Sequence, residues 1–149
     1  MKAFLIILNC LCIFVSPLSF GESQFDPFDS YGDVSWDLEK VHLDNFSVFL
    51  QHERDSIGHI TVYAGRRACV GEAKARALRA KKYLVNTRGV QDSRIKWIDA
   101  GYREELTVIL QPVPPGAPKL TASPTLKPSE VRIKKDCKAK TRKHSQRAS

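Results

Sequence analysis

The sequence lacks the residue patterns by which many enzymes and metal-binding proteins can be recognised. It has no serine-nucleophile motif, no pair of carboxylates at catalytic spacing, and no glycine-rich phosphate loop followed by Lys-Ser or Lys-Thr. Its histidines show no metal-ligand spacing with its cysteines. We therefore expect a non-catalytic protein that needs no metal and no other cofactor.

A long apolar run is also lacking near the N-terminus. The run from Ala3 to Val15 is shorter than the roughly 20 residues that a membrane-spanning helix needs. Lys2 precedes it, Pro17 lies just after its end, and small residues follow at Ser19 and Gly21. This arrangement predicts a secretory signal peptide over residues 1–21, with cleavage after Gly21. We expect an exported protein, periplasmic or otherwise associated with the cell envelope and without a transmembrane span when mature; a retained membrane anchor is the alternative.

Few cysteines remain once such a leader is removed. Cleavage takes away Cys10 and Cys12 and leaves Cys69 and Cys137. Because disulfides persist in exported proteins, these two residues could form one bridge between the C-terminal tail and the loop that holds Cys69. Two independent thiols are the alternative, since Cys137 lies in a segment with no recognisable fold.

The excess of positive charge is confined to the end of the chain. Residues 22–118 contain 13 lysines and arginines against 14 acidic residues, a net charge of −1. Residues 119–149 contain 10 against 2, a net charge of +8. No aromatic residue lies among these basic residues, which argues against single-stranded nucleic acid as a ligand. We expect no specific nucleic-acid partner, and a tail that can touch anionic surfaces.

Residue periodicity predicts six elements in the order strand, helix, strand, helix, strand, strand. The expected strands are 31–36, 59–63, 95–99 and 106–113, and the expected helices are 38–51 and 72–88. They form an α+β domain over residues 25–113, with both helices on one face of a mixed four-stranded sheet. The last two strands are expected to pair as an antiparallel hairpin. The second helix should bury a face of small residues and end at Gly89, a left-handed cap; this face comprises Ala73, Ala77, Ala80 and Leu84.

The first helix carries a polar residue within a candidate buried face. Asp37 is the expected N-cap, because its carboxylate can accept from the first backbone N–H groups. Helical spacing then selects one inner face. Asn45 on this face is either a buried amide with its hydrogen bonds satisfied or a ligand-binding residue. The face comprises Leu38, Val41, Asn45, Val48 and Phe49.

The composition changes after the fourth expected strand. Prolines separated by Ser and Thr predict an extended linker from residue 114 onward. Beyond it, the basic runs Arg132–Lys135 and Lys138–Lys143 predict a disordered terminus, which extends to residue 149.

The stretch between Ile60 and Leu110 carries a series of short motifs. An apolar strand leads into a loop, then into a helix with an Arg-Ala pair followed by Tyr83-Leu84. This order resembles the C-terminal peptidoglycan-binding domain of the OmpA-like family. The resemblance implies a scaffold of about 80 residues and a cell-wall ligand. Its further matches are Gly89-Val90, Ser93-Arg94-Ile95 and Gly101-Tyr102-Arg103-Glu104.

The resemblance also implies where a ligand would bind. In the family, an Asp after the second strand holds the amine of diaminopimelate and an Arg on the next helix holds its carboxylate. Arg76 matches the Arg, whereas the positions of the Asp hold Gly65, Arg66 and Arg67. Two interpretations follow: the chain binds peptidoglycan weakly or through other contacts, or the loop favours anions and repels an amine. Solvated or ion-paired arginines are the alternative, with Glu72 as a possible partner of Arg76.

These observations lead to a functional prediction with one alternative. We expect a non-catalytic protein of the cell envelope that binds peptidoglycan or another anionic envelope component or protein, through Arg66, Arg67, Arg76 and Asn45. The alternative is a structural or protein-interaction module that has lost peptidoglycan binding.

Overall fold

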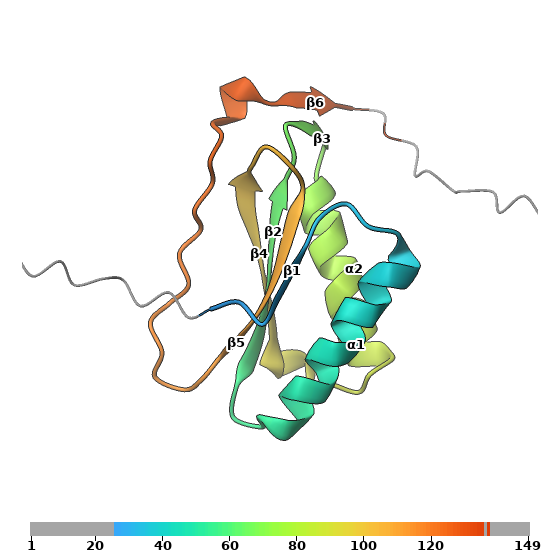
Figure 1. The fold of residues 1–149 in the computed structure, drawn as a ribbon, viewed down its shortest axis with the longest axis vertical. Coiled ribbons are helices and arrows are strands. Elements are labelled where there is room, and N and C mark those ends of the chain that lie inside the picture. Colours follow the sequence, from blue (N-terminus) through green and yellow to red (C-terminus); the bar gives the residue numbers. More distant parts are fainter. Residues whose placement is uncertain (1–25, 136, 138–149) are drawn as a thin grey trace, which may run out of the picture.

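The computed structural model describes residues 26–135 and Cys137. The expected signal peptide and the basic run after residue 137 lie outside the described residues. Within them, no helix is both long and apolar enough to cross a membrane. The chain forms an α+β fold in which two helices, α1 (Trp36–His52) and α2 (Glu72–Asn86), pack on one face of a four-stranded sheet (Figure 1).

The sheet has the order β1-β5-β2-β4. Strand β2 lies parallel to β4, whereas β5 lies antiparallel to both β1 and β2. The sheet is therefore mixed, as the sequence predicts. The strands are β1 (Asp29–Tyr31), β2 (Ile57–Ala64), β4 (Ile95–Tyr102) and β5 (Thr107–Val113).

The prediction of a hairpin between the last two strands of this sheet is wrong. Strand β5 pairs with β1 and β2 and not with β4. The turn between β4 and β5 crosses the end of β2, where the Arg103 N–H donates to the Ala64 carbonyl at 2.9 Å and the Arg66 N–H to the Glu104 carbonyl at 3.1 Å. At this crossing Gly65 is buried, and a Cβ on it would lie 3.0 Å from the Leu106 nitrogen. This close crossing places Val108 and Leu110 of β5 in the centre of the core.

Helix α1 is rotated relative to the expected orientation. Ser35, and not Asp37, is the N-cap, since its hydroxyl accepts from the Leu38 N–H at 3.3 Å. The helix carries two apolar stripes, and the stripe that packs is the one with the larger side chains. Gly58 of β2 leaves room for it, because a Cβ there would lie 2.7 Å from Leu50. The buried residues of the helix are Glu39, Leu43, Phe46, Ser47 and Leu50.

Helix α2 packs as the sequence predicts. Ala73, Ala77, Ala80 and Leu84 are all buried against the sheet. The helix ends at Asn86, two residues earlier than expected, and Gly89 then adopts a left-handed conformation with φ of 70°. There the Val90 N–H donates to the Leu84 carbonyl at 3.0 Å, which satisfies one of the last carbonyls of the helix.

The segment after β5 returns to the domain, so the expected domain end at Val113 and disorder from Arg132 are corrected. It runs on the side of the sheet opposite to the helices (Figure 1). The Ser123 N–H donates to the Tyr63 hydroxyl at 3.0 Å, and Leu126 is buried. A short turn, η2 (Pro128–Glu130), then leads into β6 (Arg132–Lys134), which pairs in parallel with β3 (Arg67–Cys69). The packing of this segment could not be predicted from the sequence, because isolated contacts hold it and they leave no periodic pattern.

Candidate functional site: a basic two-stranded ribbon

Arg76 is the residue that the family resemblance selects, and its guanidinium contacts acceptor groups of its own chain. Its Nη2 atom lies 2.8 Å from the Asp33 Oδ1 atom, and its Nη1 atom donates to the Gly32 carbonyl at 3.3 Å. The Arg76 side chain is only 11% exposed. Glu72, the expected partner, accepts instead from the Cys69 N–H at 3.1 Å. Arg76 therefore ties α2 to the loop between β1 and α1.

Arg66 is neutralised in a similar way. Its guanidinium makes two parallel contacts with the Glu104 carboxylate, at 2.7 and 2.5 Å. This hydrogen-bonded guanidinium lowers the pKa of the Glu104 carboxyl below its ordinary value. The Arg66 carbonyl also accepts from the Arg132 N–H at 2.9 Å. Arg66 thus joins the turn before β5 to the start of β6, and shares no carboxylate with Arg76.

Arg67 is placed differently, because it lies on the exposed face of the ribbon that β3 and β6 form. Arg67 pairs with Arg132, and Cys69 with Lys134, in a parallel register. Partners in such a ladder project to the same side, as do alternate residues of one strand. Arg67, Arg132 and Lys134 therefore share one face, while the buried Ala68 lies on the other.

The cations of this face have no acidic partner among the described residues. Arg67, Arg132 and Lys134 are all exposed, and the ion pairs of the described chain involve none of them. Neighbouring strands lie about 4.8 Å apart and alternate residues about 6.6 Å apart, so the three charges are close together. We call these three residues the cationic face. Like charges at this spacing repel one another, and a bound anion would relieve that repulsion.

A disulfide closes the ribbon. Cys69 and Cys137 are bonded, with their Cα atoms 5.9 Å apart and a sequence separation of 68. The sequence was compatible with either this bridge or two separate thiols, and the structure contains the bridge. Cys137 is exposed and Cys69 half-buried.

Asn45, the fourth expected site residue, is not a buried amide. It lies exposed on α1, between the exposed side chains of Val41 and Val48. Together with Leu38 these residues form the unpacked apolar stripe of the helix, which we call the α1 stripe. Its members therefore lie on a helix face that the core does not use, contrary to the expected orientation.

Sequence reasoning missed Arg132 and Lys134 as site residues. Their positive charge was visible, and the alternation Arg-Ile-Lys is compatible with a strand. The missing information was the partner strand, which lies more than 60 residues earlier in the chain.

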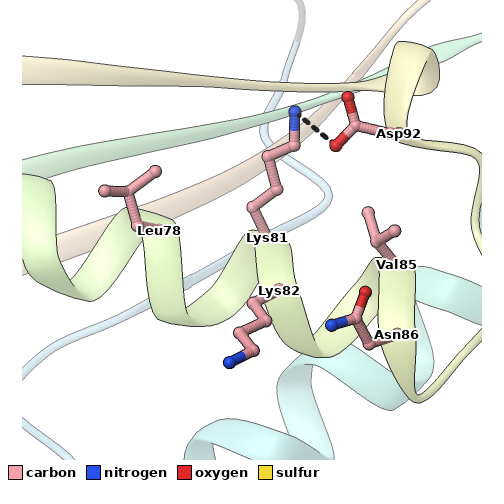
Figure 2. Close-up of a pocket in the computed structure, with 6 residues that line it drawn as sticks. All are labelled: Leu78, Lys81, Lys82, Val85, Asn86 and Asp92. Atoms are coloured by element: carbon pink, nitrogen blue, oxygen red, sulfur yellow. Dashed lines mark ion pairs between the residues drawn. The ribbon is translucent and has the colours of Figure 1, made fainter.

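A hollow on α2 offers no second site of comparable chemistry. It is open to solvent and mixes two apolar side chains with polar ones (Figure 2). Its one ion pair, Lys81 with Asp92 at 2.9 Å, is satisfied internally. Nor do the described residues contain a cluster of three or more His, Cys, Asp or Glu side chains that could hold a metal ion. The lining of the hollow comprises Leu78, Lys81, Lys82, Val85, Asn86 and Asp92.

Comparison with protein-family models, curated proteins and solved structures finds no match for this chain. The resemblance to OmpA-like domains therefore stays a prediction that rests on the residues quoted for it.

Proposed function

We propose that this chain is a non-catalytic binding protein of the cell envelope, and that its cationic face binds an anionic envelope component. The observation that carries the proposal is the contrast between two groups of basic residues. Arg66 and Arg76 are held by carboxylates of the same chain, whereas Arg67, Arg132 and Lys134 have no acidic partner among the described residues. Export to the envelope remains a prediction from the N-terminal sequence.

The chemistry of the cationic face favours carboxylate or phosphate groups that are repeated along a polymer or a surface. The planar guanidinium forks of Arg67 and Arg132 can each take two oxygens of such a group. Their neighbouring positions in the ladder allow one anion to contact both. Peptidoglycan supplies carboxylates and an anionic membrane supplies phosphates, so both are candidate ligands.

Co-sedimentation of the mature chain from residue 22 with purified peptidoglycan, and with vesicles of phosphatidylglycerol and phosphatidylcholine, tests the proposal. The variant Arg67→Gln/Arg132→Gln removes two charges of the cationic face. For whichever of the two ligands the parent chain binds, we expect the affinity of this variant to be about thirtyfold lower at low salt. Each basic residue near an anionic surface contributes about 1 kcal/mol, and the variant lacks two of them. The effect should shrink as salt is raised.

A charge-matched control makes this test specific. Arg54→Gln/Lys82→Gln removes two exposed charges away from the ribbon and should change binding little. A third protein lacking residues 138–149 measures the contribution of the terminal basic run. Binding that survives the ribbon variant and disappears with this truncation would refute the proposal and assign the interaction to the terminus.

The α1 stripe favours a second candidate function, a protein-interaction module. Leu38, Val41 and Val48 are 48%, 52% and 52% exposed. With Asn45 they follow alternating spacings of three, four and three residues, as at the contact positions of paired helices, where a central Asn specifies register. The partner that fits this pattern best is the same helix of a second copy.

Sedimentation equilibrium at increasing protein concentration tests this alternative. Val41→Glu should abolish any self-association, and Leu78→Glu, a substitution at an exposed residue of α2, serves as its control. A chain that stays monomeric at all concentrations would exclude pairing through the α1 stripe.

A further inference from the structure

Strand β6 is held to the domain by few interactions other than the disulfide. All three of its residues are exposed, so the strand itself contributes no residue to the core. Its backbone contacts at the ends are the Arg132 N–H to the Arg66 carbonyl and the Val70 N–H to the Lys134 carbonyl, at 2.9 and 3.1 Å. Isolated two-stranded pairings of this length are marginal in water.

The attachment before β6 is somewhat stronger, but it does not fix the strand. Leu126 is 8% exposed and pairs with Tyr102 through an isolated bridge. Val131 packs partly against the core. These contacts keep residues up to about 131 near the domain. Arg132 and Lys134 lie beyond them and before Cys137, so the disulfide is the one covalent tie on their far side.

We propose that the Cys69–Cys137 disulfide controls anion binding by the ribbon: the oxidised bridge assembles the cationic face, and its reduction disperses it. This inference rests on the proposed function. In the oxidised chain the ladder holds Arg132 and Lys134 beside Arg67. After reduction β6 separates from β3, the three charges no longer meet one anion together, and their mutual repulsion favours the separated state.

The chemistry requires a dithiol reductant. Cys137 is exposed and Cys69 is half-buried, so Cys137 is the more accessible end of the bridge for a thiolate of the reductant. Attack forms a mixed disulfide with Cys137, breaks the bond to Cys69, and leaves Cys69 as a thiolate that takes up a proton. The second thiol of the reductant then displaces Cys137 as a thiol. Two electrons pass to the protein, and the reductant becomes a disulfide.

Two measurements on the mature chain, oxidised and after treatment with dithiothreitol, test the inference. The first is affinity for phosphatidylglycerol vesicles and for peptidoglycan. For the ligand that the oxidised chain binds, we expect reduction to lower the affinity about thirtyfold, which is the effect of losing two of the three charges. The variant Cys69→Ser/Cys137→Ser should bind as weakly as the reduced protein, whether or not dithiothreitol is present.

The second measurement is amide hydrogen exchange, which does not depend on a ligand. Reduction should abolish protection of the Arg132 and Val70 N–H groups, while the N–H groups of β2 stay protected and report that the domain remains folded. Unchanged protection at Arg132 after reduction would overturn the inference. So would equal affinity of the oxidised and reduced chains for a ligand that the oxidised chain binds.

The two measurements separate failure of this inference from failure of the proposed function. If the oxidised chain binds neither vesicles nor peptidoglycan, the proposed function fails, and control of anion binding fails with it. In that case hydrogen exchange still reports whether reduction frees β6. If binding occurs, depends on Arg67 and Arg132, and is insensitive to reduction, the proposed function stands and the redox control is refuted.

Discussion

Replacement of Glu39 by alanine should destabilise the domain more than any other single loss of a carboxylate among the described residues. Glu39 lies on the buried face of α1 and is 0% exposed. Its carboxylate accepts a hydrogen bond from the Tyr31 hydroxyl at 3.4 Å and pairs with the Arg79 guanidinium. Arg79 in turn stacks over the Trp36 ring, 4.5 Å from its centroid.

The expected cost follows from what each partner loses. The Tyr31 hydroxyl, on a residue that is 7% exposed, loses its acceptor, which costs about 1–3 kcal/mol. Arg79 is 45% exposed, so water can replace most of its lost partner and this part of the cost is small. The missing methylenes of Glu39 leave a small void in addition. We expect Glu39→Ala to lower the free energy of unfolding by about 2–4 kcal/mol, and Tm by about 10–20 °C.

Urea and thermal denaturation measure this change. Glu53→Ala, which removes an exposed carboxylate just after the same helix, serves as the control and should stay within about 0.5 kcal/mol of the parent chain. Tyr31→Phe in the Glu39→Ala background removes the hydroxyl that has lost its acceptor and should restore part of the lost stability. A Glu39→Ala variant as stable as the Glu53→Ala control would refute the reasoning.

Three further predictions concern the sheet and the expected ligand site. Gly58→Ala should lower the free energy of unfolding by about 1–3 kcal/mol in urea denaturation, because its Cβ would lie 2.7 Å from a core methyl group, whereas Gly32→Ala should be mild. Burial and then the Lys96 charge lower the pKa of His59, so its contribution to stability is full above about pH 6.5 and is lost as pH falls through the lowered value. His59→Gln should therefore flatten the pH dependence of urea unfolding in that window. Arg76→Gln should lower Tm and leave the affinity of the folded chain for peptidoglycan unchanged, because its guanidinium already holds a carboxylate of its own chain.

Much of the fold could be predicted because it follows from regular spacing. The small-residue face of α2 is periodic, and all four of its members are buried. The order of the sheet could not be predicted in the same way. Strand β5 reaches its place because the turn before it bonds to the end of β2 and crosses Gly65 closely. Such contacts involve single backbone groups, which leave no periodic signal in the sequence.

The orientation of α1 was mispredicted for another reason. The helix has two apolar stripes at helical spacing, and periodicity alone cannot choose between them. The choice is made across the interface, where Gly58 leaves space for Phe46 and Leu50. This orientation of α1 also buries Glu39, a charged residue type that would be expected on the surface of the helix. The polar residue that the sequence placed inside, Asn45, lies outside.

The candidate site illustrates how a motif can select arginines that the fold pairs with carboxylates of the same chain. Arg66 and Arg76 stand where the chain folds back on itself, so carboxylates from the turn before β5 and from the loop after β1 reach them. An arginine in such a place contributes to the attachment of neighbouring segments, and its guanidinium already contacts a carboxylate of the same chain. Arg67 lies one position further along, on the opposite side of β3, and there its neighbour is another cation. The ladder between β3 and β6 therefore gathers cations that no carboxylate of the described residues pairs with, and the Cys69–Cys137 bridge links β3 to the chain just beyond β6.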